Sequence, residues 1–149
     1  MLKIALLFLT ITDVYHEDYW LDFLRGNETR YSIYVHSKKQ VSEGLFFKKY
    51  EMAIKVPTEW ERPMKAQVAL LREALKDPKN DKFIFLSETT IPLQDFETVY
   101  ERIMITNKSI FQYWPNPHLK EGPDFDPRRI LHEIPITFTI QKFPMDNFK

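Results

Sequence analysis

The stretch that decides the fold is KIALLFLTI, residues Lys3–Ile11, an almost uninterrupted apolar run. A strand covered on both faces reads in this way, because neither of its faces carries polar residues. The run holds about eight apolar residues, whereas a membrane-spanning helix needs about twenty. No small-residue cleavage site follows it, and the chain goes directly into Asp13 and His16. We therefore predict a buried first strand without a signal peptide or membrane anchor, in a cytoplasmic protein or, in a bacterium, a membrane-peripheral one.

Further strands and helices alternate after this run. Tyr31–Val35 and Lys82–Leu86 (KFIFL) have the composition of buried strands. Amphipathic helices are expected over Asp18–Leu24, from Pro63 onward, and after Asp95, whose carboxylate suits a helix N-cap. Strands that alternate with helices form a mainly parallel sheet with helices on both faces. We predict the three strands as neighbours in a three-layer α/β domain.

Two finer expectations concern the middle of the chain. Phe46–Val56 is interpreted as an extended stretch whose strand signal is weaker than that of the other runs. The helix that begins near Pro63 is expected to bury one apolar stripe, formed by Met64, Val68, Leu71 and Leu75.

Composition excludes several classes of protein. The chain has 149 residues, enough for one domain with a real core. Twenty-one basic residues balance 21 acidic ones, so no overall charge attracts nucleic acid, and we expect no nucleic-acid partner. The absence of cysteine excludes disulfides, thiolate metal sites and a cysteine nucleophile.

Polar residues follow all three predicted strands, in the segments Thr10–Asp13, His36–Lys39 and Ser87–Thr90. In an open parallel sheet, ligands bind beyond the carboxyl ends of the strands. The sequence therefore predicts a ligand site where these three segments meet.

Several segments together resemble the core-2/I-branching N-acetylglucosaminyltransferase family, in its plant and bacterial branch. The resemblance rests on KIALLFLT at residues 3–10, YSIYVHS at 31–37, EWERP at 59–63, NDKFIFLSETTIPL at 80–93 and DFETVYERIM at 95–104. It covers roughly residues 3–113. The chain departs from the family at Ser37, where many members have an acidic residue, and at Glu61, where relatives commonly have glycine.

The resemblance implies a GT-A-like, Rossmann-type fold that binds a nucleotide-diphospho-sugar. It implies a nucleotide-sugar-binding portion over residues 1–113 and, in the same domain, the proline-rich start of an acceptor-side portion over 114–149. Members move N-acetylglucosamine or a related sugar from a UDP donor onto a glycan hydroxyl. They do so without a divalent cation, so we expect no metal and no other cofactor. Asp124-Phe125-Asp126 matches an Asp-x-Asp pattern, but it lies in a proline-rich segment far from the inner strands.

The donor-binding candidates lie at the strand ends and before the helix near Pro63, and each has a structural alternative. Arg62 at the start of that helix could hold the diphosphate, or could form an ordinary surface ion pair. Trp60 could stack on uracil or a sugar, or could pack as a helix-entry staple. The remaining candidates are Thr10, Thr12, His36, Ser37, Glu88, Thr89 and Thr90, for which ordinary turn structure is the alternative.

The resemblance says less about catalysis and the acceptor. Glu88 is a weak candidate for the base, and the catalytic residue is otherwise unknown, because the family's carboxylate and its diphosphate-holding basic residues correspond to positions beyond Lys149. Gln112, Arg128 and Arg129 fall where the family binds its acceptor. Residues 1–149 alone are expected to bind UDP-sugar weakly and to transfer none, and to associate with a missing C-terminal half or with themselves. Two other hypotheses remain open: a non-catalytic module that binds UDP-sugar or glycan, and a scaffolding domain.

Overall fold

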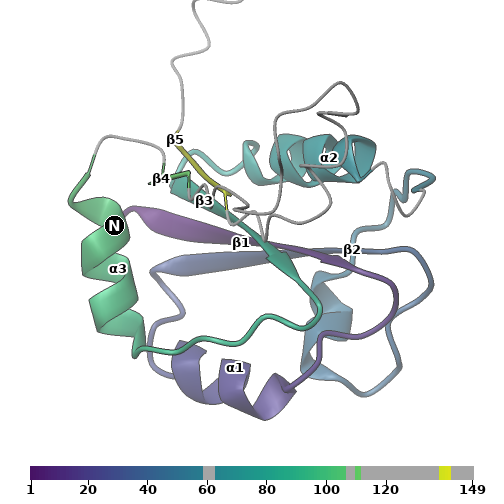
Figure 1. Cartoon of the computed structure of the whole chain (residues 1–149), viewed down its shortest axis with the longest axis horizontal. Coiled ribbons are helices and arrows are strands. Elements are labelled where there is room, and N and C mark those ends of the chain that lie inside the picture. The colour runs from purple at the N-terminus through teal and green to yellow at the C-terminus, as the bar shows by residue number, and fades with distance from the viewer. Residues whose placement is uncertain (59–62, 107–109, 112–137, 142–149) are drawn as a thin grey trace, which may run out of the picture.

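A computed structural model describes residues 1–58, 63–106, 110–111 and 138–141. Within these residues the strands form one sheet in the order β2-β1-β3-β5-β4 (Figure 1). Their bounds are Lys3–Thr10 for β1, Tyr31–Ser37 for β2, Asn80–Ser87 for β3, Ile110–Phe111 for β4 and Phe138–Gln141 for β5.

The first three strands are parallel neighbours, as predicted. Leu6 of β1 lies between Ile33 of β2 and Ile84 of β3. β5 then runs antiparallel to β3, and β4 runs antiparallel to β5. The predicted α/β class with a mainly parallel central sheet is therefore confirmed.

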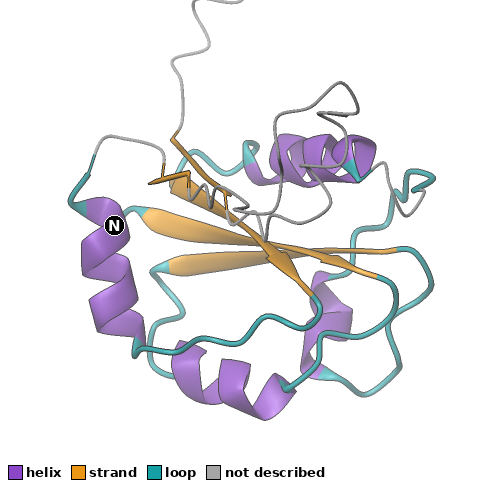
Figure 2. Ribbon diagram, in the orientation of Figure 1, coloured by secondary structure: helices purple, strands orange, loops and turns teal. Residues whose placement is uncertain are grey.

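Helices cover both faces of the sheet, which gives three layers (Figure 2). The described helices are α1 at Glu17–Leu24, the short 3-10 helix η1 at Phe46–Tyr50, α2 at Met64–Ala74 and α3 at Phe96–Met104. Helix α2 lies on one face, whereas α1, η1 and α3 lie on the other (Figure 1). Among the described helices, none is both long and apolar enough to cross a membrane.

The main core lies between the sheet and the α1 side. At its centre the ring of Phe8 meets Trp20 of α1 and Phe47 of η1 edge-on, each with a centroid distance of 5.0 Å. All three side chains are buried. Phe8 of β1 therefore joins α1, which follows the loop after β1, to η1, which follows the loop after β2.

The buried face of α2 differs from the predicted stripe. Ala66, Leu70 and Ala74 face the sheet and are fully buried, whereas Met64 and Val68 are exposed. Small residues on the inward face allow a helix to pack close to a sheet. The prediction of Met64 and Val68 as buried residues was wrong because it ranked residues by hydrophobicity and ignored this close approach.

The extended stretch predicted over Phe46–Val56 was also wrong. Residues 46–50 form η1, and only Glu51 makes an isolated parallel bridge to Val35. The short helix places the ring of Phe47 inside the core, while Tyr50 packs against Phe46. Contact with the core therefore decides the local conformation here.

The predicted cap of α3 is confirmed. Asp95 is the N-cap residue, and its carboxylate accepts hydrogen bonds from the Thr98 amide and the Thr98 hydroxyl, both at 2.9 Å. This cap defines where the segment after β3 ends and the helix begins.

Candidate functional site

The carboxyl ends of β1 and β2 are held together by backbone hydrogen bonds. Thr10 lies opposite Ser37 in the strand register. Beyond the strands, the Lys38 amide donates to the Thr10 carbonyl at 2.9 Å, and the Lys39 amide donates to the Ile11 carbonyl at 2.7 Å. The two polar segments that the sequence placed at this edge therefore lie side by side.

The segment after β3 joins the same edge through Glu88. Its carboxylate accepts a hydrogen bond from the Ile11 amide, and its carbonyl accepts one from the Tyr15 amide at 2.8 Å. Two residues later, the Thr90 carbonyl accepts a hydrogen bond from the Trp20 indole at 3.0 Å. The structure therefore brings all three strand ends together.

Most of the candidate hydroxyl groups at this edge already have partners. Thr10 is buried and donates to the Thr12 carbonyl at 2.8 Å. Thr89 and Thr90 lie within hydrogen-bond distance of the Ser87 hydroxyl, at 3.2 and 3.0 Å. These hydrogen bonds shape the turn after β3 and leave the exposed Thr89 at its surface.

His36 is completely buried at the end of β2. Burial lowers its pKa, and the nearby charge of Lys55 acts in the same direction, so the ring is neutral near physiological pH. Nε2 accepts a hydrogen bond from the Val56 amide at 3.0 Å, which places the ring proton on Nδ1. Among the described residues Nδ1 has no hydrogen-bond partner. His36 Nδ1 is therefore a buried donor without an acceptor in the described part of the chain.

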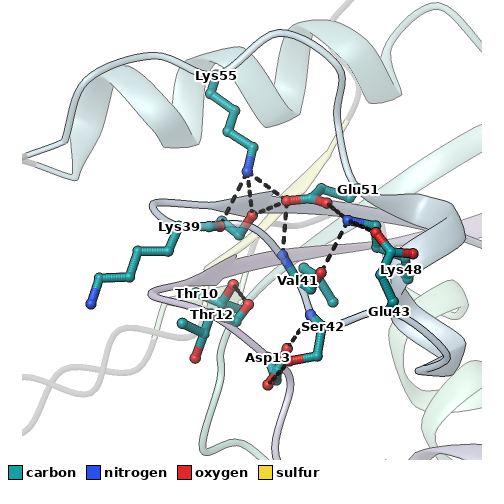
Figure 3. Close-up of polar contacts among 11 residues, drawn as sticks. Thr10, Thr12, Asp13, Lys39, Val41, Ser42, Glu43, Lys48, Glu51 and Lys55 are labelled. Atoms are coloured by element: carbon teal, nitrogen blue, oxygen red, sulfur yellow. Dashed lines mark hydrogen bonds and ion pairs between the residues drawn. The ribbon is translucent and has the colours of Figure 1, made fainter.

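Ser37 belongs to a polar cluster centred on Glu51 (Figure 3). The Glu51 carboxylate accepts hydrogen bonds from the Ser37 hydroxyl and, at 3.1 Å, from the Val41 amide. Lys48 pairs with it at 3.0 Å and Lys55 at 2.5 Å. We call these five residues the Glu51 cluster.

The Glu51 cluster folds the segment after β2 back onto the strand end. Partial burial alone would raise the pKa of Glu51, but its hydrogen bonds with Lys55, Ser37, Lys48 and the Val41 amide lower it to about 2. The carboxylate is therefore ionised throughout the physiological range. Lys55 also donates to the Lys39 carbonyl at 3.1 Å, so the cluster fixes the backbone beside the β1 edge.

The side chains of two further lysines at this edge do not belong to the Glu51 cluster. Lys38 and Lys39 are exposed. Figure 3 shows the Lys39 side chain extending away from Glu51, on the side where Thr10 and Thr12 lie. Within the part of the chain that the structure describes, neither ammonium group forms an ion pair.

Several predicted site residues lie outside the described ranges. They are Trp60, Arg62, Gln112, Arg128 and Arg129, together with Glu61 and the Asp124–Asp126 triplet. Among the described residues, no group of three or more His, Asp or Glu side chains could hold a metal ion.

The sequence profile of the core-2/I-branching enzymes matches residues 4–147, almost the whole chain. The chain belongs to this family. It is also 30% identical over 135 residues to a protein named glycosyltransferase BC10 from Oryza sativa subsp. japonica. That alignment covers 84% of this chain and 34% of the rice protein, so the chain spans about a third of its relative's length. No solved structure matches the chain.

Two carboxylates that organise the carboxyl edge of the sheet, Glu51 and Asp13, were not among the predicted site residues. Glu51 was placed in an extended stretch, which hid its spacing of three residues from Lys48 and four from Lys55. For Lys48, which lies in η1, that spacing is the available signal, because residues three apart share one side of a helical turn, whereas Lys55 lies beyond η1. Asp13 was also missed; its carboxylate accepts hydrogen bonds from the Ser42 amide at 2.7 Å and the Ser42 hydroxyl at 2.9 Å.

Proposed function

We propose that this chain forms the donor-binding part of a glycosyltransferase that moves a sugar, N-acetylglucosamine or a related one, from UDP to a glycan hydroxyl. One observation carries the proposal: in a core-2/I-branching family member, three polar strand ends are hydrogen-bonded into one edge. Such an edge is where open α/β sheets bind nucleotides. The rice relative's name supports the same class of reaction.

The edge supplies groups of the kind that a UDP-sugar requires. The donor at His36 Nδ1 is buried, and a ligand carbonyl that reached it would satisfy it. The ammonium groups of Lys38 and Lys39 would oppose the negative charge of the diphosphate. Charge builds on the diphosphate as the sugar leaves, so fixed cations at this position would stabilise the transition state.

Donor binding is proposed to be independent of divalent cations. Hard cations that bridge phosphates require oxygen ligands such as carboxylates, and the carboxylates described at this edge, Glu88, Asp13 and Glu51, each accept a hydrogen bond from a backbone amide. In calorimetric titrations of residues 1–149 with UDP, we expect the same Kd with magnesium and with EDTA. A large loss of affinity in EDTA would refute metal-free binding, and no binding under either condition would refute the donor site itself.

Lys39→Ala is expected to weaken UDP binding about fivefold, because one cation near the diphosphate is lost. Uridine lacks phosphate, so its affinity should be unchanged. The matched control is Lys79→Ala, an exposed lysine just before β3, at the opposite end of the sheet. Equal effects of the two substitutions on UDP, or an equal loss for uridine, would show that Lys39 does not face the diphosphate.

A second candidate function is a module that binds UDP-sugar or glycan without catalysing transfer. The engagement of the Glu88 carboxylate with the Ile11 amide favours it, because a base must be able to reach the acceptor hydroxyl. Incubating residues 1–149 with UDP-N-acetylglucosamine and varied glycan acceptors separates the two. Transfer or donor hydrolysis that is lost in Glu88→Gln supports catalysis by Glu88, whereas UDP binding without turnover supports the module.

A further inference from the structure

A hollow of about 440 Å³ lies beside α1, and none of its lining residues belongs to the Glu51 cluster. Its walls are α1 and the segment that leads from β3 into α3, which Figure 1 shows running along that helix. The lining residues are Tyr19, Asp22, Phe23, Pro92, Leu93, Gln94 and Asp95. The volume is within the range of small-molecule sites.

The core holds this hollow in shape. Phe23 packs edge-on against Trp20, with ring centroids 5.7 Å apart, and in a tilted arrangement against Phe96, with centroids 5.2 Å apart. The Trp20 indole donates to the Thr90 carbonyl and so ties α1 to the opposite wall. Asp95 fixes the far end of that wall as the cap of α3. The two walls are therefore joined at both ends of the segment.

The lining combines exposed apolar surface with hydrogen-bonding groups and negative charge. The side chains of Tyr19 and Leu93 are 61% and 83% exposed. Asp22, Gln94 and Asp95 supply carboxylate and amide groups, and no lysine or arginine contributes to the lining. Asp22 pairs with Arg25, whose side chain lies outside the lining set. Two carboxylates without a lining cation disfavour nucleotides, phosphates and other anions.

These groups suit an uncharged sugar. A pyranose has an apolar C–H face that can pack on an aromatic ring, and its hydroxyl groups can donate to carboxylates and exchange hydrogen bonds with an amide. Each wall carries both kinds of surface: Tyr19 and Asp22 lie on α1, and Leu93 and Gln94 lie on the facing segment. A ligand bridging the walls would thus meet both kinds of surface.

We infer that this hollow binds a neutral saccharide unit of the acceptor glycan, at a distance from the reacting hydroxyl. The inference rests on the proposed function for the existence of a glycan acceptor. The segment that forms one wall begins at Ser87–Thr90, the same turn that contributes to the donor edge. A glycan that reaches from the hollow to that turn would be oriented along the segment before transfer.

The test is a titration of ¹⁵N-labelled residues 1–149, followed by amide NMR shifts, with chitotriose, N-acetyllactosamine and cellotriose, each up to about 10 mM to cover weak affinities. At least one saccharide is expected to shift the amides of residues 19–23 and 93–95. Tyr19→Ala should weaken that binding about fivefold through the loss of stacking, while Tyr19→Phe keeps it. Tyr15→Ala is the matched control, since Tyr15 is exposed and lies outside the hollow.

The outcomes separate this inference from the proposed function. UDP binding with no saccharide-induced shifts at residues 19–23 and 93–95 would refute saccharide binding at the hollow. The proposal of a donor site would be unaffected. Saccharide-induced shifts at these amides without UDP binding would support saccharide binding at the hollow and contradict the proposed donor site. Stronger binding of an anionic sugar, glucuronic acid, at the same amides would also overturn the inference, because the lining would then not select uncharged ligands.

Discussion

Phe8→Ala is expected to lower the free energy of unfolding by about 4 kcal/mol, the largest single-residue effect that we predict. Phe8 is fully buried and packs edge-on against Trp20 and Phe47. Removing its ring leaves a cavity among side chains from β1, α1 and η1, which cannot all close around it. Urea unfolding followed by circular dichroism measures the loss, and the Tm should fall by roughly 12 °C.

The matched control is Phe46→Ala, the same substitution at the neighbouring residue of η1. Phe46 is only partly buried and packs beside Tyr50 at the margin of the core. We expect a loss of about 1 kcal/mol there, because solvent can fill the vacated space. Similar losses for the two variants would contradict the position of Phe8 at the centre of the core.

Glu51→Ala is expected to lower the free energy of unfolding by about 2 kcal/mol and to loosen the segment between β2 and Val56. The substitution leaves Lys48, Lys55, the Ser37 hydroxyl and the Val41 amide without the acceptor that they share. Hydrogen exchange of the Val41 and Met52 amides should accelerate as well, because this segment is held to β2 by few backbone bonds.

Glu43→Ala is the control for this substitution. Glu43 also pairs with Lys48, at 3.1 Å, but its side chain is 79% exposed. An exposed ion pair of this kind contributes little, so the loss should stay below about 0.5 kcal/mol. Equal losses for Glu43→Ala and Glu51→Ala would show that the cluster acts only as surface charge.

The pH dependence of stability provides a second readout for Glu51. Its pKa is about 2 in the folded chain against an ordinary value of 4.5, so its contribution is fully present above about pH 4.5 and falls as the pH approaches 2. The difference in stability between the wild-type chain and Glu51→Gln should therefore shrink on acidification. Asp77, Asp95 and Glu97 also have lowered pKa values, but they are common to both proteins and cancel in the difference.

The sequence predicted the location of the candidate site at the carboxyl edge of the sheet. Three polar segments after three strands indicate one edge, and the register of β1 with β2 and β3 confirms that they meet. What each residue does there was not predictable. Ser37 and Glu88 were candidates for ligand contact, with ordinary turn structure as the alternative, and the structure shows their side chains bonded to Glu51 and to the Ile11 amide. Contacts between residues 14 or more positions apart leave no periodic pattern in the sequence.

The sequence by itself determined the elements whose signals are local. The apolar runs of β1 and β3 specify buried strands, Asp95 specifies the start of α3, and the spaced motifs identify the family. Apolar composition and capping act within a few residues, so they can be read without knowing the fold.

Only the tertiary structure decided which surfaces these elements present. Packing against the sheet determined that Ala66, Leu70 and Ala74 form the inward face of α2. Contact with Phe8 favoured a helical turn at Phe47. The two walls of the hollow beside α1 are linked by the hydrogen bond from the Trp20 indole to the Thr90 carbonyl, 70 residues away in the chain. Packing free energy depends on the shape and distance of partners that folding brings together, and neither quantity is encoded in any one segment.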